Sequence, residues 1–345
     1  MPIAQRAKQF APFKAVTGLD EALEKKRREM EYEEERELSK DRAEEINRIL
    51  NGRSYEKDRL TVINASEVIE TGDVPVMAVQ EKKDSSLVVG MTLLRTGEAD
   101  AFISCGSTGA LLVAGQVIAG RLKGVKRAPL GVLLPTRKGE TLLIDCGANV
   151  DARPENLLQF AVIGSLYLEN VRGIKSPRVG LVNIGTEEEK GNQLTREAYP
   201  LLKQLPGINF IGNAEARDIP AGVADVCVCE AFSGNIVLKM YEGTAKALLG
   251  EIKSALKSSF LGKIGGLLIK PSLKKLLKTF DGAENGGAPM LGLNGLVVKA
   301  HGNSDANQVK NAILQSIGFS RNNVNEKIVR AIAAMKKTVE TAEQA

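Results

Sequence analysis

The sequence has few of the residues that mark several common classes of protein. Its 345 residues include no Trp, a single His and four Cys, and aromatic residues make up only 4%. With so few aromatic rings there is no evident platform for stacking bases, so nucleic acid is not an expected partner. No Cys-x-x-Cys pair is present and His301 lies far along the chain from every cysteine, which disfavours a zinc site and a Cys–His catalytic pair. We expect no metal and no cofactor.

Long apolar runs are also missing. No stretch approaches the ~20 consecutive apolar residues that a membrane-spanning helix needs. Residues 1–6 have no apolar segment behind them and do not resemble a secretory signal. Hydrophobic residues make up 43% and charged residues 26% of the chain, which is typical of a soluble globular protein. We therefore expect a cytoplasmic location. A basic region described below indicates that the protein also associates peripherally with a membrane.

The first 54 residues differ from the rest of the chain. They hold twelve basic and twelve acidic side chains, many of them three or four positions apart, a spacing that favours a solvated helix. From about residue 59, apolar segments alternate with helical patterns, and no internal repeat is present. We predict a charged helical appendage over residues 1–54 and a catalytic domain over residues 55–345.

Eight apolar segments predict the strands of this domain. Several are near-continuous apolar runs, as expected of strands that are covered by helices on both faces. The alternation of strands and helices predicts an α/β fold, in which a mainly parallel sheet lies between two helical layers. The expected strands are 60–64, 101–105, 131–135, 142–146, 179–184, 209–212, 226–229 and 296–300.

Loops of small polar residues follow five of these strands. Glycine lets a backbone approach an anion, and a helix N-terminus offers unpaired N–H groups. Each loop alone could simply cap a helix, but several at one edge of a sheet favour a phosphate-like ligand. The chain has no P-loop and no Gly-x-Gly-x-x-Gly after a strand, which argues against a nucleotide or dinucleotide site. The loops are 64–67, 106–109, 147–149, 185–192 and 230–235.

Two of these loops carry a family resemblance. Gly-Thr-Glu-Glu-Glu-Lys-Gly-Asn at 185–192 and Glu-Ala-Phe-Ser-Gly-Asn-Ile-Val-Leu-Lys at 230–239 resemble the phosphate acyltransferase family PlsX, and segments 104–110, 145–149, 286–292 and 300–302 match it as well. The resemblance implies a Rossmann-like layered fold of the phosphotransacetylase and isocitrate dehydrogenase superfamily, and a homodimer. It also implies transfer of an acyl group from acyl carrier protein to inorganic phosphate. The acyl phosphate would feed a glycerol-3-phosphate acyltransferase downstream in phospholipid synthesis.

The resemblance points to Lys190 and Asn235 as catalytic residues. A lysine can neutralise phosphate, and a side-chain amide can donate to the oxyanion that forms from a thioester, a role typically worth ~3 kcal/mol. Lys190 could instead form surface ion pairs with the glutamates at 187–189, and Asn235 could instead cap a helix. Phosphate itself can be the nucleophile, so no acyl-enzyme is required, and His301 is a binding or structural residue in preference to a general base.

Further candidates are expected to contact phosphate or the acyl substrate. They lie in the loops described above and in the His-Gly turn after the last expected strand. They are Gly106, Ser107, Thr108, Gly109, Asp145, Asn149, Asn183, Gly185, Thr186, Ser233, Gly234 and His301.

A lysine-rich segment at 252–280 is expected to bind an anionic membrane surface. It holds seven lysines and no acidic residue, interleaved with apolar side chains, which is typical of helices that lie in such a surface. Pro271 predicts a break into two short helices. A dimer-packing hairpin and a docking surface for acyl carrier protein are alternatives. The expected membrane contacts are Phe260, Leu261, Ile264, Leu267, Leu268, Lys270, Lys274 and Lys275.

The beginning of the chain departs from the family pattern. Family members begin with a strand that carries an Asp-Ala-Met-Gly-Gly-Asp-like motif, which has no counterpart here. Residues 6–19 resemble the small YolD-like bacterial family instead, and a genuine fusion and an assembly or gene-calling artefact both fit this junction. A missing strand would leave an open sheet edge and lower stability or activity. Alternative functions are a phosphotransacetylase that uses coenzyme A thioesters and an inactive membrane-associated binding protein.

Overall fold

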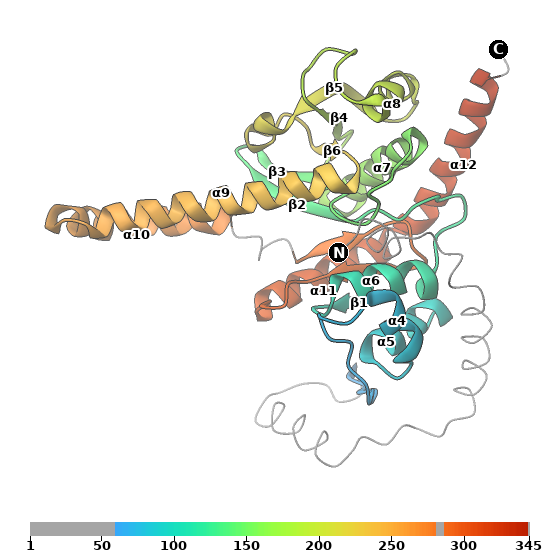
Figure 1. The fold of residues 1–345 in the computed structure, drawn as a ribbon, viewed down its shortest axis with the longest axis horizontal. Coiled ribbons are helices and arrows are strands. Elements are labelled where there is room, and N and C mark those ends of the chain that lie inside the picture. The colour runs from blue at the N-terminus through green and yellow to red at the C-terminus, as the bar shows by residue number, and fades with distance from the viewer. Residues whose placement is uncertain (1–58, 281–285, 344–345) are drawn as a thin grey trace, which may run out of the picture.

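The computed structural model describes residues 59–280 and 286–343, with side chains for 59–271 and 286–336 (Figure 1). Its strands form two sheets. The three-stranded sheet has the order β1-β8-β7, and the five-stranded sheet has the order β2-β3-β6-β4-β5. The strands are β1 (Ala101–Ser104), β2 (Gly131–Thr136), β3 (Gly139–Ile144), β4 (Arg178–Asn183), β5 (Asn209–Glu215), β6 (Val226–Val228), β7 (Ala288–Met290) and β8 (Leu296–Lys299).

Most strand pairs are parallel, as predicted. They are β1 with β8, β3 with β6, β6 with β4 and β4 with β5. The two antiparallel pairs are the β2–β3 hairpin and β7 with β8. An isolated bridge between Leu130 and Met290 joins the two sheets side by side. The hairpin and β7 were not expected from the sequence, where the short segment 288–290 carries little apolar signal.

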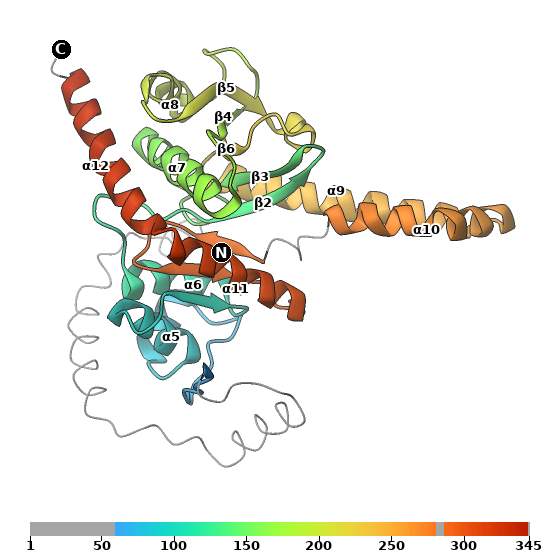
Figure 2. The ribbon, with the colours of Figure 1, turned by 180° about the vertical axis from the view of Figure 1, so that it is seen from behind.

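Helices cover both faces of both sheets (Figures 1 and 2). They are α4 (Pro75–Glu81), α5 (Ser86–Thr96), α6 (Thr108–Ala114), α7 (Pro154–Tyr167), α8 (Gln193–Gln204), α9 (Ala231–Lys257), α10 (Phe260–Phe280), α11 (Ala306–Arg321) and α12 (Val324–Glu343). Two π-helical segments, Gly115–Ala119 and Leu168–Arg172, extend α6 and α7, and a 3₁₀ helix follows β5 at Ala216–Ala221.

The alternation of side chains along β3 shows why the layers form. Leu142 and Ile144 join the core that contains Phe160 of α7, whereas Leu143 joins a second cluster, against which Leu238 of α9 packs. Successive side chains of a strand point to opposite faces, so an uninterrupted apolar run needs a helix on each side. The predicted layered α/β fold is therefore confirmed.

The first expected strand, 60–64, is not a strand. This segment is irregular, and the side chains of Leu60 and Ile63 are largely exposed. No strand among the described residues pairs with it, so its apolar residues have no sheet on which to pack. In the part of the chain that the structure describes, β1 is consequently an edge strand with four half-buried residues.

The helix break expected at Pro271 is also misplaced. Helix α10 continues through Pro271, and the chain turns at Ser258 and Ser259. There the Ser258 hydroxyl donates to the Ala255 carbonyl at 2.8 Å, and the Ser259 hydroxyl accepts from the Gly262 N–H at 2.9 Å. These serine side chains compete with helical hydrogen bonds, ending one helix and capping the next. Helices α9 and α10 form a hairpin that projects from the body (Figure 1).

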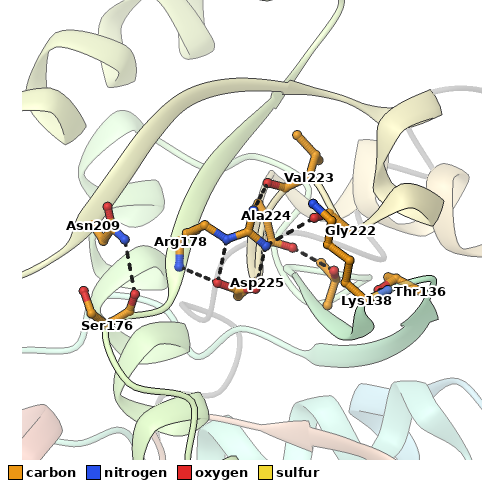
Figure 3. A network of polar contacts seen from close by, with 10 residues as sticks. Thr136, Lys138, Ser176, Arg178, Asn209, Gly222, Val223, Ala224 and Asp225 are labelled. Atoms are coloured by element: carbon orange, nitrogen blue, oxygen red, sulfur yellow. Dashed lines mark hydrogen bonds and ion pairs between the residues drawn. The ribbon is translucent and has the colours of Figure 1, made fainter.

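A polar network secures the amino ends of β4 and β6 (Figure 3). The Arg178 guanidinium donates to Asp225 Oδ1 at 2.9 Å and Oδ2 at 3.1 Å, and to the carbonyl oxygens of Val223 and Gly222 at 2.9 and 3.2 Å. Burial alone would raise the pKa of Asp225, but hydrogen bonds from Arg178 and its charge outweigh burial and lower it. This network holds the five-stranded sheet together at the edge away from the loops described next.

Candidate functional site

Three neighbouring strands deliver most of the predicted residues to one edge. Strands β3, β6 and β4 lie side by side and run in the same direction, so their carboxyl ends share an edge of the sheet. Adjacent strands are about 4.8 Å apart, which places the following loops in reach of one another. Asp145 and Asn149 follow β3, Lys190 lies in the loop after β4, and Asn235 lies in the first turns of α9 after β6.

Asp145 organises the loop after β3. Its side chain is fully buried, and Oδ1 accepts hydrogen bonds from the N–H groups of Leu130, Gly147 and Ala148 at 3.1, 3.2 and 3.0 Å. Its Oδ2 accepts from the backbone and side-chain nitrogens of Asn149 at 2.8 and 2.7 Å. Burial raises the pKa of Asp145 and these hydrogen bonds partly offset the rise. Both oxygens are occupied within the protein, so Asp145 and Asn149 shape the loop.

Asn183 shapes the loop after β4 in a similar way. Its buried amide donates to the Lys190 carbonyl at 3.0 Å and to Asn213 Oδ1 at 3.1 Å, and its oxygen accepts from the Ile184 N–H at 2.9 Å. A β-carbon on Gly191, where φ is +101°, would lie 2.3 Å from Asn183 Oδ1, so this turn requires glycine. The loop thus holds the backbone of Lys190 in place while its side chain stays exposed.

Lys190 has no ion-pair partner among the described residues. Of the three adjacent glutamates, Glu188 pairs with Lys203 at 2.5 Å instead. The structure therefore does not contain the alternative arrangement, in which Lys190 forms ion pairs with the glutamates at 187–189. Gly185 and Thr186 lie in the same loop, Gly185 buried and Thr186 exposed.

Glu230, and not Asn235, caps helix α9. Its carboxylate accepts from the N–H groups of Phe232 and Ser233 at 2.6 and 3.0 Å, and also from the Ser233 hydroxyl. The alternative interpretation of Asn235 as a cap is thus wrong. Asn235 is half-buried, and its side chain makes no hydrogen bond to the described part of the protein. The Ala231 N–H donates to the Asn149 carbonyl at 3.1 Å, which fixes α9 against the loop after β3.

The remaining candidates lie on the three-stranded sheet. Ser107 accepts from the Ala110 N–H at 3.4 Å and caps α6, and Gly106 donates to the Ser104 hydroxyl at 3.1 Å. Gly109 leaves room for Pro75, which would lie 2.7 Å from a β-carbon there. Thr108 and His301 are exposed. The predicted residues therefore form two groups on two sheets, and not one continuous rim.

Packing beside the loop after β3 links the two groups. Ala148, from the loop after β3, packs against the hydrophobic cluster that contains Ala110 and Leu111 of α6. Lys299, which the sequence analysis did not single out, ends β8 beside Ser104 of β1, and its ammonium donates to the Ala300 carbonyl. Burial lowers the pKa of Lys299, and the nearby Cys105 thiol partly offsets this. A lysine that ends an otherwise apolar strand is the one signal that could have identified it.

The hairpin exposes the apolar residues expected to contact a membrane. Phe260, Leu261, Ile264, Leu267 and Leu268 are all exposed, and so is Lys270. Lys274 and Lys275 fall outside the residues whose side chains are described. Within the described segments, no helix is long and apolar enough to cross a bilayer.

Similarity to solved structures defines the fold class. The fold resembles a EutD phosphotransacetylase from Staphylococcus aureus, with a TM-score of 0.51 and 17% identity, covering 81% of this chain and 84% of that one. A phosphotransacetylase from Streptococcus pyogenes gives a TM-score of 0.51 and 20% identity over the same shares. The chain therefore has the layered α/β fold of the phosphotransacetylases.

Sequence relatives define the family. The model of a family described as "Fatty acid synthesis protein" matches residues 10–327. A phosphate acyltransferase of Clostridium novyi is 49% identical over 82% of this chain and 85% of its own length, and one of Clostridium tetani is 46% identical over 93% and 95%. This chain belongs to the phosphate acyltransferase family, as its loops predicted. The match begins inside the predicted appendage, which lies outside the described residues.

Proposed function

We propose that Lys190 and Asn235 form the reacting centre of an enzyme that transfers an acyl group from acyl carrier protein to inorganic phosphate. A phosphate oxygen attacks the thioester carbonyl carbon, the carbon–sulfur bond breaks, and the carrier leaves as a thiolate that takes up a proton. Membership of the phosphate acyltransferase family supports this reaction. The main supporting observation is that two side chains without a hydrogen-bond or ion-pair partner among the described residues follow adjacent parallel strands.

The two residues have complementary roles in this proposal. The exposed Lys190 ammonium neutralises phosphate and holds it near the thioester. The Asn235 amide donates to the carbonyl oxygen as negative charge develops there. The first N–H groups of α9 are occupied by Glu230, so this helix end is not free to bind the anion. In this proposal Lys190, and not the N-terminus of α9, therefore binds the phosphate.

The other candidates support this centre. Asp145, Asn149 and Asn183 position the loops through the hydrogen bonds described above. We propose that Gly185, Thr186, Ser233 and Gly234 line the phosphate side. We further propose that Gly106, Ser107, Thr108, Gly109 and His301, on the neighbouring sheet, line the side on which the carrier's thioester enters.

Assay of acyl phosphate as hydroxamate tests the reacting centre. Purified variants are compared in the presence of hexadecanoyl carrier protein and phosphate. Lys190→Ala and Asn235→Ala are each expected to lose about 100-fold or more in kcat while remaining folded. Lys203→Ala is the matched control, because that lysine lies near the same loop but pairs with Glu188. Near-normal rates in both test variants would remove the assignment.

The exposed apolar and basic surface of the hairpin favours a second proposal, attachment to an anionic membrane. The acyl phosphate would then be delivered to the glycerol-3-phosphate acyltransferase at that surface, and a homodimer would present two hairpins. Co-sedimentation with anionic vesicles is expected to fall strongly in Leu267→Glu/Leu268→Glu. Unchanged vesicle binding with weaker carrier binding would instead assign the surface to acyl carrier protein.

A further inference from the structure

Five apolar side chains are exposed at the edge where β3, β6 and β4 end. Ile184 is 80% exposed, Met240 68%, Phe232 61%, Ile236 53% and Val150 45%. Val150 and Ile184 lie in loops that also carry candidate polar residues, and the other three lie in the first turns of α9, the helix that carries Asn235. We call these five residues the rim patch.

The topology places the rim patch on neighbouring segments. Ile184 directly follows β4, and Phe232 lies in the first turn of α9, after the central strand β6. Val150 follows Asn149, whose carbonyl accepts from Ala231, the residue before Phe232. Three adjacent strand ends thus each present one exposed apolar residue.

The patch continues along α9. Phe232, Ile236 and Met240 are spaced by four residues and therefore lie on one side of the first turns of the helix. On the other side, Val237, Leu238 and Tyr241 pack against the sheet. From Phe232 to Met240 the patch extends roughly 12 Å along the helix axis.

Burial is inverted in two of these loops. Asn149 is buried and the next residue, Val150, is exposed; Asn183 is buried and the next residue, Ile184, is exposed. The side-chain nitrogens of both asparagines donate hydrogen bonds that hold the loops. The apolar residues are left facing outward beside Lys190 and Asn235. Clustered exposed apolar side chains mark a site for an apolar ligand or partner.

We propose that the rim patch binds the hydrocarbon chain of the acyl donor. The thioester carbonyl lies at Asn235, and the chain runs from Phe232 over Ile236 to Met240, with Val150 and Ile184 on either side of its first carbons. This inference rests on the proposed function and adds the residues that set chain length. Its physical basis is continuity: an acyl group that reacts at Asn235 must place its tail on a surface next to that residue.

Chain-length preference tests the proposal. The variants Met240→Gln and Leu248→Gln are compared in kcat/KM with hexadecanoyl and hexanoyl carrier protein, without vesicles. Leu248 is a matched control, because it is exposed on the same helix but lies two turns beyond the patch. Met240→Gln is expected to lose about tenfold with the long chain and little with the short one. Leu248→Gln is expected to change neither.

Two outcomes of the kinetic and sedimentation measurements would overturn the proposal. One is an equal loss with both chain lengths. The other is a change in sedimentation of Met240→Gln without a change in preference, which would assign the patch to a second copy of the chain. Titration of the wild type and Met240→Gln with hexadecanoyl carrier protein measures binding directly. If the wild type binds but makes no acyl phosphate from either donor, the proposed function fails. In that case the titration alone tests the rim patch. Equal affinity of the wild type and Met240→Gln for hexadecanoyl carrier protein would then overturn the proposal.

Discussion

The carbonyl oxygen of Asp145 occupies the space in which a side chain on Gly234 would begin, 1.9 Å from the β-carbon position. Helix α9 can therefore approach the loop after β3 only with glycine at this position. The contact ties the backbone of the Asn235 region to the most strongly hydrogen-bonded loop of the site.

Replacing this glycine is expected to separate α9 from the loop. Gly234→Ala should lower the free energy of unfolding by about 1–3 kcal/mol and reduce kcat, because the backbone must shift to admit a methyl group. Thermal unfolding and the hydroxamate assay measure the two effects. Gly243→Ala on the same helix is the control, since nothing lies within 4 Å of its β-carbon position. That variant should gain up to about 1 kcal/mol from helix propensity.

Asn183→Ala is expected to act on the reaction through Lys190. Its amide holds the Lys190 carbonyl at 3.0 Å and also bonds Asn213. Removing it leaves buried polar groups without partners, at a cost of about 1–3 kcal/mol. We expect a raised KM for phosphate, measured with hexadecanoyl carrier protein in excess. Lost stability together with an unchanged KM would give Asn183 a structural role only.

Two adjacent lysines offer a direct comparison of paired and unpaired charge. Lys82 bonds Asp73 at 2.6 Å and the Val68 carbonyl at 2.9 Å, whereas the ammonium of Lys83 is buried and has no hydrogen-bond partner among the described residues. Lys83→Met is expected to raise the free energy of unfolding at pH 7 by about 1 kcal/mol, and Lys82→Met to lower it. Urea unfolding measures both. Destabilisation by Lys83→Met would indicate a partner for this ammonium.

The pKa of Lys83 gives this prediction a pH dependence. Burial lowers the pKa of its ammonium in the folded protein. The folded state therefore disfavours the charged form, and the penalty decreases as pH rises from the folded pKa toward the ordinary lysine value. The advantage of Lys83→Met should accordingly shrink at alkaline pH. An advantage that is constant from neutral to alkaline pH would contradict this cause.

Asp225→Asn is expected to weaken the sheet at neutral pH. Arg178 lowers the pKa of Asp225, so the carboxylate contributes stability above the ordinary aspartate pKa and loses it as pH falls through the folded pKa. The variant should therefore approach the wild type in stability at acidic pH. Thermal unfolding across the acid range tests this. Glu188→Gln, which removes an exposed pair with Lys203, should leave the stability almost unchanged, because solvent screens that pair.

The core of the fold was predictable because its strands appear in the sequence as continuous runs of apolar residues. The segments 131–135 and 179–184 lie within one or two residues of β2 and β4, since fully covered strands leave little choice of pattern. The segment 60–64 carries the same signal, but no strand of the described residues lies beside it. Whether an apolar run becomes a strand depends on a neighbour, which local sequence does not contain.

The sequence indicated where the candidate residues lie relative to the strands, but not which hydrogen bonds their side chains form. Lys190 and Asn235 do follow adjacent strands, as their loops indicated. Glu230 caps α9, and both carboxylate oxygens of Asp145 accept hydrogen bonds within and next to its own loop. These interactions depend on side-chain directions, which the spacing of residues in the sequence does not reveal. Similarly, Pro271 is the stronger helix breaker by composition, but the Ser258–Ser259 pair supplies competing hydrogen bonds and sets the turn.

Helix α9 runs without a break from the proposed reacting centre to the hairpin turn. From Asn235 to Lys257 it extends about 33 Å. A surface or partner that binds the hairpin end of α9 therefore also affects the orientation of the Asn235 amide, because no break in the helix separates the two. Shortening α9 and α10 together by whole turns would change the reach of the enzyme and leave its chemistry in place.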